Sequence, residues 1–170
     1  MRIIDEIARR RSVREYSEAP VAQECLDSIL EAGRLAPTAR NQQDWRIIIV
    51  ADPRIRDRLA DEASPHQPFL KQAAIILAAC ALNPEYVMRC GQPAYPIDLA
   101  IVLDHIALQA VREGLGTCWI GSFDEGKAKE VLQVPDPVRI VELMSLGHPH
   151  RLPGARPRRP ITELYRWNSW

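Results

Sequence analysis

The sequence has little of what would mark a disulfide-bonded or metal-binding protein. Its four cysteines are Cys25, Cys80, Cys90 and Cys118. They form no Cys-x-x-Cys pair and have no histidine at zinc-ligand spacing, so neither a disulfide framework nor a structural metal is indicated. His148 and His150 flank a proline without an accompanying carboxylate or cysteine, and we expect no metal site there. The simplest interpretation is four thiols in a reducing compartment.

Export signals and long apolar segments are also missing. The N-terminus shows no apolar signal region, and the longest apolar run, residues 73–82, is too short to span a bilayer. Acidic and basic residues balance at 22 each, so no net field favours nucleic acid or an anionic membrane. We therefore expect a soluble, cytoplasmic protein with no nucleic-acid and no membrane partner.

The usual nucleotide-binding motifs are absent as well. No Gly-x-Gly-x-x-Gly follows a predicted strand and no P-loop occurs, so a Rossmann dinucleotide site is not indicated. The chain has only three lysines, and its positive charge is carried by arginines crowded near both ends. Two basic ends of this kind could converge on one anion.

What is present is enough for one domain, 1–170, in which 151–170 form an extended, proline- and arginine-rich arm. Apolar spacing predicts helices over 2–10, 21–35, 53–60, 96–113 and 124–132, and strands over 45–50, 73–82, 117–120 and 138–146. The segment 96–113 is apolar nearly all round, which indicates a central buried helix that could also meet a second subunit. The order predicts an α/β (α+β) fold with a mixed central sheet of four to five strands flanked by helices.

The stretch from Arg9 to Arg14 places four guanidiniums and the hydroxyl of Ser12 within six residues. The arginine fork suits phosphate oxygens, and serine adds a small donor at close range. A solvated helix end explains the same residues, because cations are favoured at a helix C-terminus. Taken alone, the pattern leaves both interpretations open.

The loop from Ala36 to Trp45 carries a hydroxyl and three carboxamides immediately before a strand. Carboxamides both donate and accept hydrogen bonds, which suits the edge of a heterocycle better than a bare anion. A polar loop in which an asparagine caps a turn is the alternative.

Five motifs occur in the order and approximate spacing of the FMN-dependent nitroreductase family, which the chain resembles over nearly its whole length. They are Arg10-Arg11-Ser12-x-Arg14, Ala36-Pro37-Thr38-x-x-Asn41-x-Gln43-x-Trp45, Gly114-Leu115-Gly116-x-x-Trp119-x-Gly121, Ser145-Leu146-Gly147 and Arg156-Pro157-Arg158-Arg159-Pro160. No single motif is decisive, but five in order are hard to obtain by chance.

The resemblance implies a nitroreductase-like homodimer with one FMN per subunit at the interface, reached by the C-terminal arm of the partner. It implies that the FMN phosphate and ribityl chain are held by Arg10, Arg11, Ser12, Arg156 and Arg158. It places Arg14 at the N1 and O2 edge of the flavin, where a cation stabilises the reduced ring. It implies that the other subunit supplies Pro37, Thr38, Ala39, Asn41 and Gln43, and that backbone groups of Ile120 and Gly121 reach N5 and O4.

The activity that the resemblance implies is ping-pong reduction of nitroaromatic, quinone-type or related small acceptors, with NAD(P)H as the reductant. The flavin carries the chemistry, so no side chain is singled out as an obligatory acid or base. A flavoenzyme of reductive dehalogenation or flavin cleavage and a non-catalytic flavin store or sensor are the alternatives. A further alternative is a protein whose two basic ends bind nucleic acid, and the net neutrality of the chain argues against it.

The chain departs from the family pattern in two places. Ala39 lacks the second hydroxyl of the usual loop, and Asp44 replaces its second proline. The segment 83–95 is shorter than in larger relatives, which carry helices over the active site there. We therefore expect a more open pocket, or one that another element closes.

Overall fold

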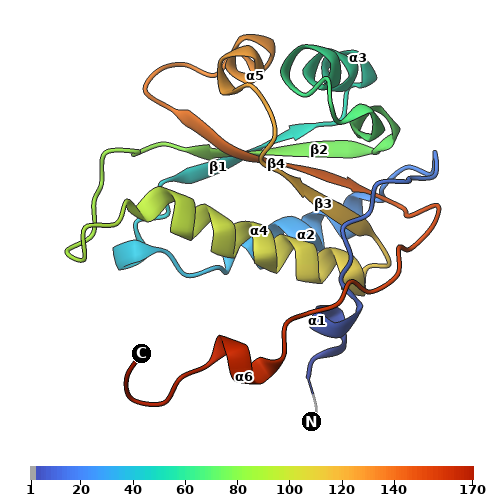
Figure 1. Ribbon diagram of the computed structural model, residues 1–170. Helices are drawn as coiled ribbons and strands as arrows, with labels where there is room; N and C mark the ends of the chain where they lie inside the picture. Colours follow the sequence, from blue (N-terminus) through green and yellow to red (C-terminus); the bar gives the residue numbers. More distant parts are fainter. Residues whose placement is uncertain (1–2) are drawn as a thin grey trace.

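The computed structural model describes residues 3–170 as one four-stranded sheet with helices against both faces (Figure 1). The strands are β1 (Trp45–Val50), β2 (Ile75–Ala81), β3 (Gly116–Ile120) and β4 (Arg139–Gly147), in the spatial order β1-β2-β4-β3. All four lie within about two residues of the predicted ranges. The β-branched run of β1 matches its prediction residue for residue.

The expected mixed sheet requires a correction. All three strand pairings are antiparallel, with Trp45 opposite Ala81 in the first, Ile75 opposite Leu146 in the second and Gly116 opposite Gly147 in the third. Parallel pairing among the described residues is limited to one isolated bridge, between Ser12 and Thr117. The prediction failed because alternating helices and strands suggest parallel crossovers, whereas here each strand enters the sheet beside an oppositely directed neighbour.

One face of the sheet is covered by α2 (Gln23–Arg34) and α4 (Ala94–Arg112), and the other by α3 (Pro53–Arg58) and α5 (Glu125–Leu132) (Figure 1). A π-helical turn, Leu59–Ala63, follows α3, and a 3-10 turn, Pro68–Gln72, precedes β2. The core therefore divides into two clusters, one on each face of the sheet.

The central helix predicted over 96–113 is α4, which begins two residues earlier than expected. Its length and hydropathy would allow it to cross a membrane, but it packs under the sheet against α2, as a core helix does. A Cβ atom placed on Gly33 of α2 would lie 2.9 Å from Cγ1 of Ile106. Glycine at this position thus allows the two helices to approach closely.

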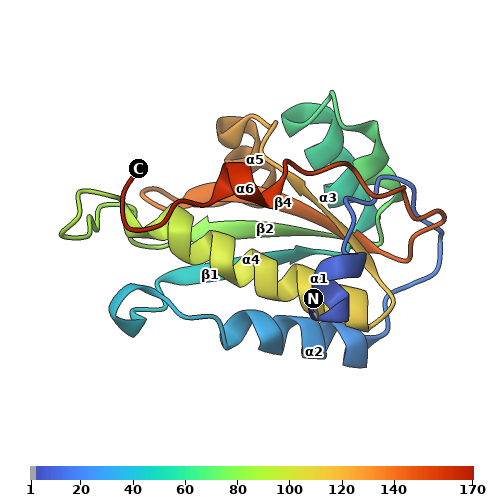
Figure 2. The same cartoon turned by 60° about the horizontal axis from the view of Figure 1, so that its bottom comes forward.

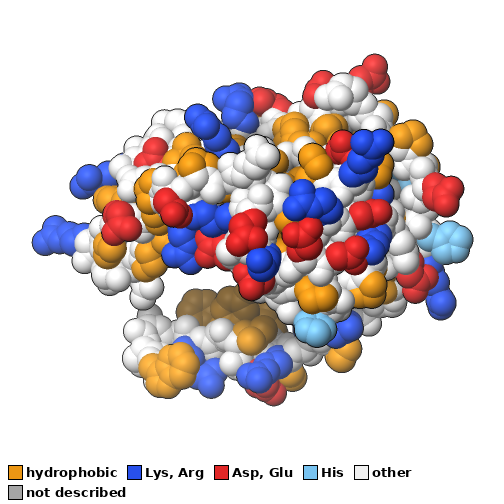
Figure 3. Space-filling model, turned by 90° about the horizontal axis from the view of Figure 1, so that it is seen from above, with side chains coloured by type: hydrophobic (Ala, Val, Ile, Leu, Met, Phe, Trp, Pro, Cys, Tyr) orange, Lys and Arg blue, Asp and Glu red, His pale blue; other side chains and the backbone are white. Residues whose placement is uncertain are grey.

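The two ends of the chain lie on the α4 side of the sheet (Figure 2). The short helix α1 (Asp5–Arg9) contacts α4, with the carboxylate of Glu6 3.1 Å from the guanidinium of Arg112. Residues 151–170, which include α6 (Ile161–Leu164), are exposed throughout in this single chain. Figure 3 shows a hollow between this segment and the body of the domain. Residues 152–156 and 158 of the segment line cavities together with N-terminal residues of the same chain.

Candidate active site

The arginine-rich segment after α1 is fastened to β3 by a buried valine. Val13 is 1% exposed, and its backbone N–H donates to the carbonyl of Thr117 at 2.9 Å. A Cβ atom placed on Gly116 would lie 2.5 Å from Cγ2 of Val13, so only glycine leaves room for this contact. Ser12 and Arg14, on either side of Val13, are therefore held at a fixed place beside the strand.

Tyr16 provides the second anchor of this segment. Its hydroxyl lies 2.9 Å from the carbonyl oxygen of Val13, to which it donates, and 2.7 Å from Oγ of Ser145 on β4. Burial raises the pKa of Tyr16, partly opposed by the hydrogen bond to Ser145, so the hydroxyl stays protonated at neutral pH. The ring is 7% exposed and belongs to the core.

The same segment draws the C-terminal region to the N-terminal one. The N–H of Ser17 donates to the carbonyl of His148, and the N–H of His150 donates to the carbonyl of Glu15, both at 2.9 Å. Tyr16 and Pro149 also form an isolated antiparallel β-bridge. The chain that leaves β4 is therefore directed past the arginines that follow α1.

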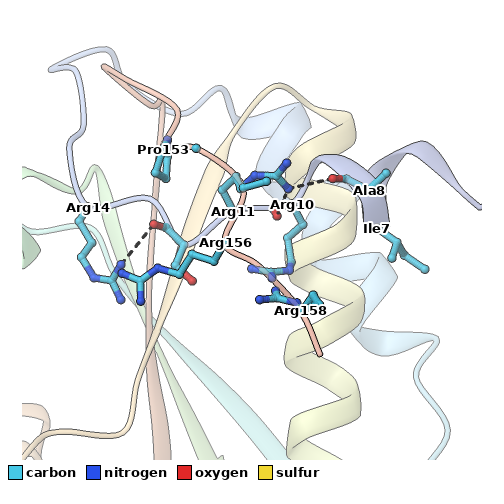
Figure 4. Close-up of a pocket in the computed structure, with 11 residues that line it drawn as sticks. Ile7, Ala8, Arg10, Arg11, Arg14, Pro153, Arg156 and Arg158 are labelled. Carbon is cyan, nitrogen blue, oxygen red and sulfur yellow. Dashed lines mark hydrogen bonds between the residues drawn. The ribbon is translucent and has the colours of Figure 1, made fainter. Parts of the chain in front are cut away.

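The two basic segments line one cavity of about 420 Å³ (Figure 4). Its walls are Ile7, Ala8, Arg10, Arg11, Ser12, Arg14, Pro153, Gly154, Ala155, Arg156 and Arg158. Figure 4 shows Arg10 and Arg158 directed toward one part of the cavity and Arg14 and Arg156 toward another. All five residues expected at the phosphate and ribityl chain, and Arg14, therefore lie around a single pocket.

Charge in this pocket is unbalanced. Among residues 3–170, no carboxylate forms an ion pair with any of its five arginines. The guanidinium of Arg11 donates at 2.8 Å to the carbonyls of Ala8 and Arg10, which satisfies acceptors at the end of α1. The guanidinium of Arg14 lies over the ring of Phe69, 5.9 Å from its centroid. Like charges gathered without counter-charges favour a bound anion.

The carboxamide loop lies elsewhere in the molecule. It follows α2 and includes the 3-10 turn Ala39–Asn41, and its residues do not line the arginine pocket. The N–H of Ala39 donates to Asp98 on α4 at 2.9 Å, and the N–H of Gln43 donates to Oγ1 of Thr38 at 3.1 Å. Figure 1 places the loop and the arginine segment at opposite ends of α4. One chain therefore does not assemble the complete expected site.

Three residues of this loop adopt left-handed backbone. Arg40, Asn41 and Gln43 have φ near 55°, which is uncommon for residues other than glycine. Such backbone persists where the surroundings enforce it, and it clusters at ligand sites. The loop is also tied to the segment that follows β2, since Asn83 donates to Asp44 at 3.2 Å and Arg40 lies over Tyr86. Asp44, which departs from the family pattern, thus has a structural partner.

The last predicted residues lie at the end of β3. Ile120 is buried, whereas Gly121 is exposed and sits beside Glu142 of β4. Neither Glu142 nor Tyr16 was expected at the site from the sequence. A lone acid within the apolar strand 138–146 was the one available signal for Glu142, and Tyr16 gave none.

Comparison with known proteins assigns the chain to a family. The family model described as Nitroreductase family matches residues 7–90 and 64–148. The chain belongs to the nitroreductase family. A nitroreductase family protein from Clostridium novyi NT has 32% sequence identity and a TM-score of 0.81, with 88% of this chain and 86% of that chain covered.

Two further nitroreductase relatives have named activities. The FMN reductase (NADPH) of Bacillus subtilis is 27% identical, over 98% of this chain and 74% of that protein. The NADPH:FMN oxidoreductase from Vibrio harveyi, solved in complex with NAD+, has 26% identity and a TM-score of 0.88, covering 98% of this chain and 76% of that one. These matches extend over both the arginine segment and the carboxamide loop.

Proposed function

We propose that this nitroreductase is a cytoplasmic FMN-dependent NAD(P)H oxidoreductase. The observation that carries the proposal is the convergence of two arginine segments, with Ser12, on one pocket that holds no carboxylate. Relatives from Bacillus subtilis and Vibrio harveyi bear the names FMN reductase and NADPH:FMN oxidoreductase, which supports FMN as the bound anion.

The donor set fits a phosphomonoester. Arg10, Arg156 and Arg158 supply guanidinium forks without competing acids, and Ser12 supplies a hydroxyl. Such forks pair with phosphate oxygens in a bidentate manner. Arg11 lines the same pocket, but part of its fork is occupied by carbonyls of α1. We assign Arg11 to the edge of the phosphate and ribityl site.

The chain's own residues have separate roles in this proposal. Bound FMN would supply the hydride chemistry between NAD(P)H and a nitroaromatic or quinone-type acceptor. Arg14 would hold positive charge at the pyrimidine edge of the ring, and its stacking on Phe69 would keep it oriented. Backbone groups of Ile120 and Gly121 would face the reactive edge of the flavin.

The second part of the site is proposed to come from another copy of the chain. The loop residues Pro37, Thr38, Ala39, Asn41 and Gln43 do not line the arginine pocket of their own chain. A homodimer would bring the loop of one subunit to the pocket of the other and would give the exposed arm a surface to cover. Trp167 and Trp170 of that arm are 91% and 108% exposed in the single chain, which favours such a partner.

The test is to purify the protein, record its absorption, and add NADH or NADPH without oxygen. The proposal predicts a yellow protein whose oxidised flavin spectrum bleaches and returns when a quinone or nitroaromatic is added. A colourless protein that FMN does not reconstitute contradicts it. A yellow protein that does not bleach would instead support a flavin store or sensor.

A further inference from the structure

Glu142 occupies an unusual position in β4. Ile140 and Leu143 both pack in the cluster under α3 and α5, although strict alternation would place residues three apart on opposite faces. The register shifts here, with Glu142 opposite Ala79 and Ile140 opposite the next residue, Cys80. This bulge turns Glu142 to the other face, where Met144 packs with α2 and α4. Bulges that re-aim one side chain are common beside active sites.

The carboxyl group of Glu142 is half-buried. Among residues 3–170, no hydrogen bond or ion pair to its oxygens is present. By contrast Glu125, also half-buried, binds both Arg139 and the backbone of Ile140. An acid withdrawn from water without a partner favours its neutral form, and burial accordingly raises the pKa of Glu142.

The group also lies next to the proposed flavin site. A Cβ atom placed on Gly121 would be 3.6 Å from each carboxylate oxygen of Glu142, an ordinary contact distance. Glu142 also acts electrostatically on the thiol of Cys118, as do Arg14 and Arg10 of the arginine pocket. The pKa of Cys118 is raised chiefly by burial, lowered by Arg14 and Arg10, and raised by Glu142.

We propose that Glu142 is the proton donor of this site, which rests on the proposed function. In the reduction of a quinone, the acceptor gains a hydride equivalent that originates from NAD(P)H, and one proton from Glu142. Both carbonyl π bonds of the quinone are lost as it becomes a hydroquinone: the hydride equivalent supplies one of the two new O–H bonds, the proton from Glu142 supplies the other, and the O–H bond of Glu142 breaks to leave a carboxylate. NAD(P)H becomes NAD(P)+, and solvent water reprotonates Glu142 for the next turnover.

Among residues 3–170, burial accounts for the raised pKa of Glu142, and no neighbouring charge contributes to it. The thiol of Cys118 on β3 is influenced by Glu142 and also by Arg14 and Arg10, and its own raised pKa keeps it protonated at neutral pH. The partner across from Glu142 on β2 is Ala79, and its neighbours on β4, Val141 and Leu143, are apolar. A single ionisation should therefore govern the proton-transfer step.

The experiment separates the two half-reactions of the FMN-loaded enzyme. Glu142→Gln keeps the shape of the side chain but removes its proton, and Glu130→Gln on the exposed face of α5 is the matched control. We expect reduction by NADPH to change less than about twofold in Glu142→Gln. Quinone reduction should fall by about 10²-fold and lose its pH dependence, since a general acid contributes at least that much.

A second readout does not need activity. Infrared titration of the FMN-free protein should show one protonated carboxyl that persists toward neutral pH in the wild type and in Glu130→Gln, and is missing in Glu142→Gln. If Glu142→Gln does not fold, Glu142→Asp replaces it and should keep the pH dependence with a displaced midpoint.

Quinone reduction within about twofold of wild type, or persistence of the carboxyl signal in Glu142→Gln, overturns the assignment. A wild-type protein that fails to bind FMN or to bleach with NAD(P)H overturns the proposed function, and the proton-donor role with it. That failure is distinguishable because it affects every variant alike, before any acceptor is added.

Discussion

Replacing Tyr16 with phenylalanine removes one oxygen atom that holds the arginine segment against the sheet. The lost hydroxyl leaves the carbonyl of Val13 without its 2.9 Å donor and Ser145 without its 2.7 Å partner. A buried polar group left unpaired costs about 1–3 kcal/mol, so we expect Tyr16→Phe to lower the free energy of unfolding by about 2 kcal/mol. For a chain of this size that corresponds to a fall in Tm of roughly 4–8 °C.

Tyr16→Phe should also affect FMN binding at the arginine pocket. Because Val13 lies between Ser12 and Arg14, loosening its carbonyl should weaken FMN binding several-fold without removing any ligand-binding side chain. The loss of stability should not vary with pH below about 10, where the hydroxyl of Tyr16 carries its proton in both folded and unfolded states. Urea unfolding and FMN titration measure the two effects.

A double-mutant cycle with Ser145→Ala supplies the control. The two changes should be non-additive by about 0.5 kcal/mol or more, since the residues share a hydrogen bond. Unchanged stability together with unchanged FMN affinity in Tyr16→Phe would refute the idea that this hydroxyl positions the segment.

Three further outcomes follow from the same structure. Arg14→Ala should lower the flavin reduction potential and slow reduction by NAD(P)H roughly tenfold, which corresponds to about 1.4 kcal/mol in the activation barrier. FMN affinity should change less. An unchanged potential in an anaerobic redox titration would show that Arg14 does not lie at the flavin ring. Gly116→Ala should destabilise the fold by about 1–3 kcal/mol, because its Cβ atom would lie 2.5 Å from Cγ2 of Val13. Gly121→Ala should not, because the nearest atoms to its Cβ would be 3.6 Å away. Equal urea midpoints for the two variants would contradict the packing argument. The hydrogen bond from Arg139 lowers the pKa of Glu125, so this interaction stabilises the fold above the usual glutamate pKa and is lost as pH falls through the lowered pKa. The difference in unfolding free energy between wild type and Glu125→Gln should therefore shrink on acidification. A difference that stays constant in urea unfolding at several pH values would contradict this role of Glu125.

The four strands and the helices α2 to α5 could be predicted because local chemistry largely determines where they begin and end, whereas α6 and the short π-helical and 3-10 turns were not predicted. Asp52 caps α3 by accepting from the N–H of Arg54, and Asp124 caps α5 by accepting from the N–H of Lys127, as side chains at these positions commonly do. Gly114 ends α4 with φ of +75°, a conformation that glycine adopts readily. Strand direction could not be predicted in this way, because it depends on which distant segments pair.

Site residues that are adjacent in sequence, such as the arginines, could be predicted. Site residues whose position depends on long-range contacts could not. Five motifs in order indicated the two basic segments, and the structure places both around one pocket. The position of Tyr16 depends on Ser145, more than a hundred residues away, and the orientation of Glu142 depends on a bulge in β4. Their neighbours in sequence indicate neither feature. The separation of the carboxamide loop from the pocket likewise depends on the length and direction of α4.

The central claim is that the arginine pocket holds the phosphate of FMN. Comparing FMN with riboflavin, which lacks that phosphate, tests it most directly in the wild type and in the double variant Arg10→Gln, Arg158→Gln. Each charge-assisted hydrogen bond contributes about 1.5–3 kcal/mol, so FMN affinity should fall by about 10²-fold or more while riboflavin affinity stays within about threefold. Equal losses for both ligands, or no loss for FMN, would contradict the account.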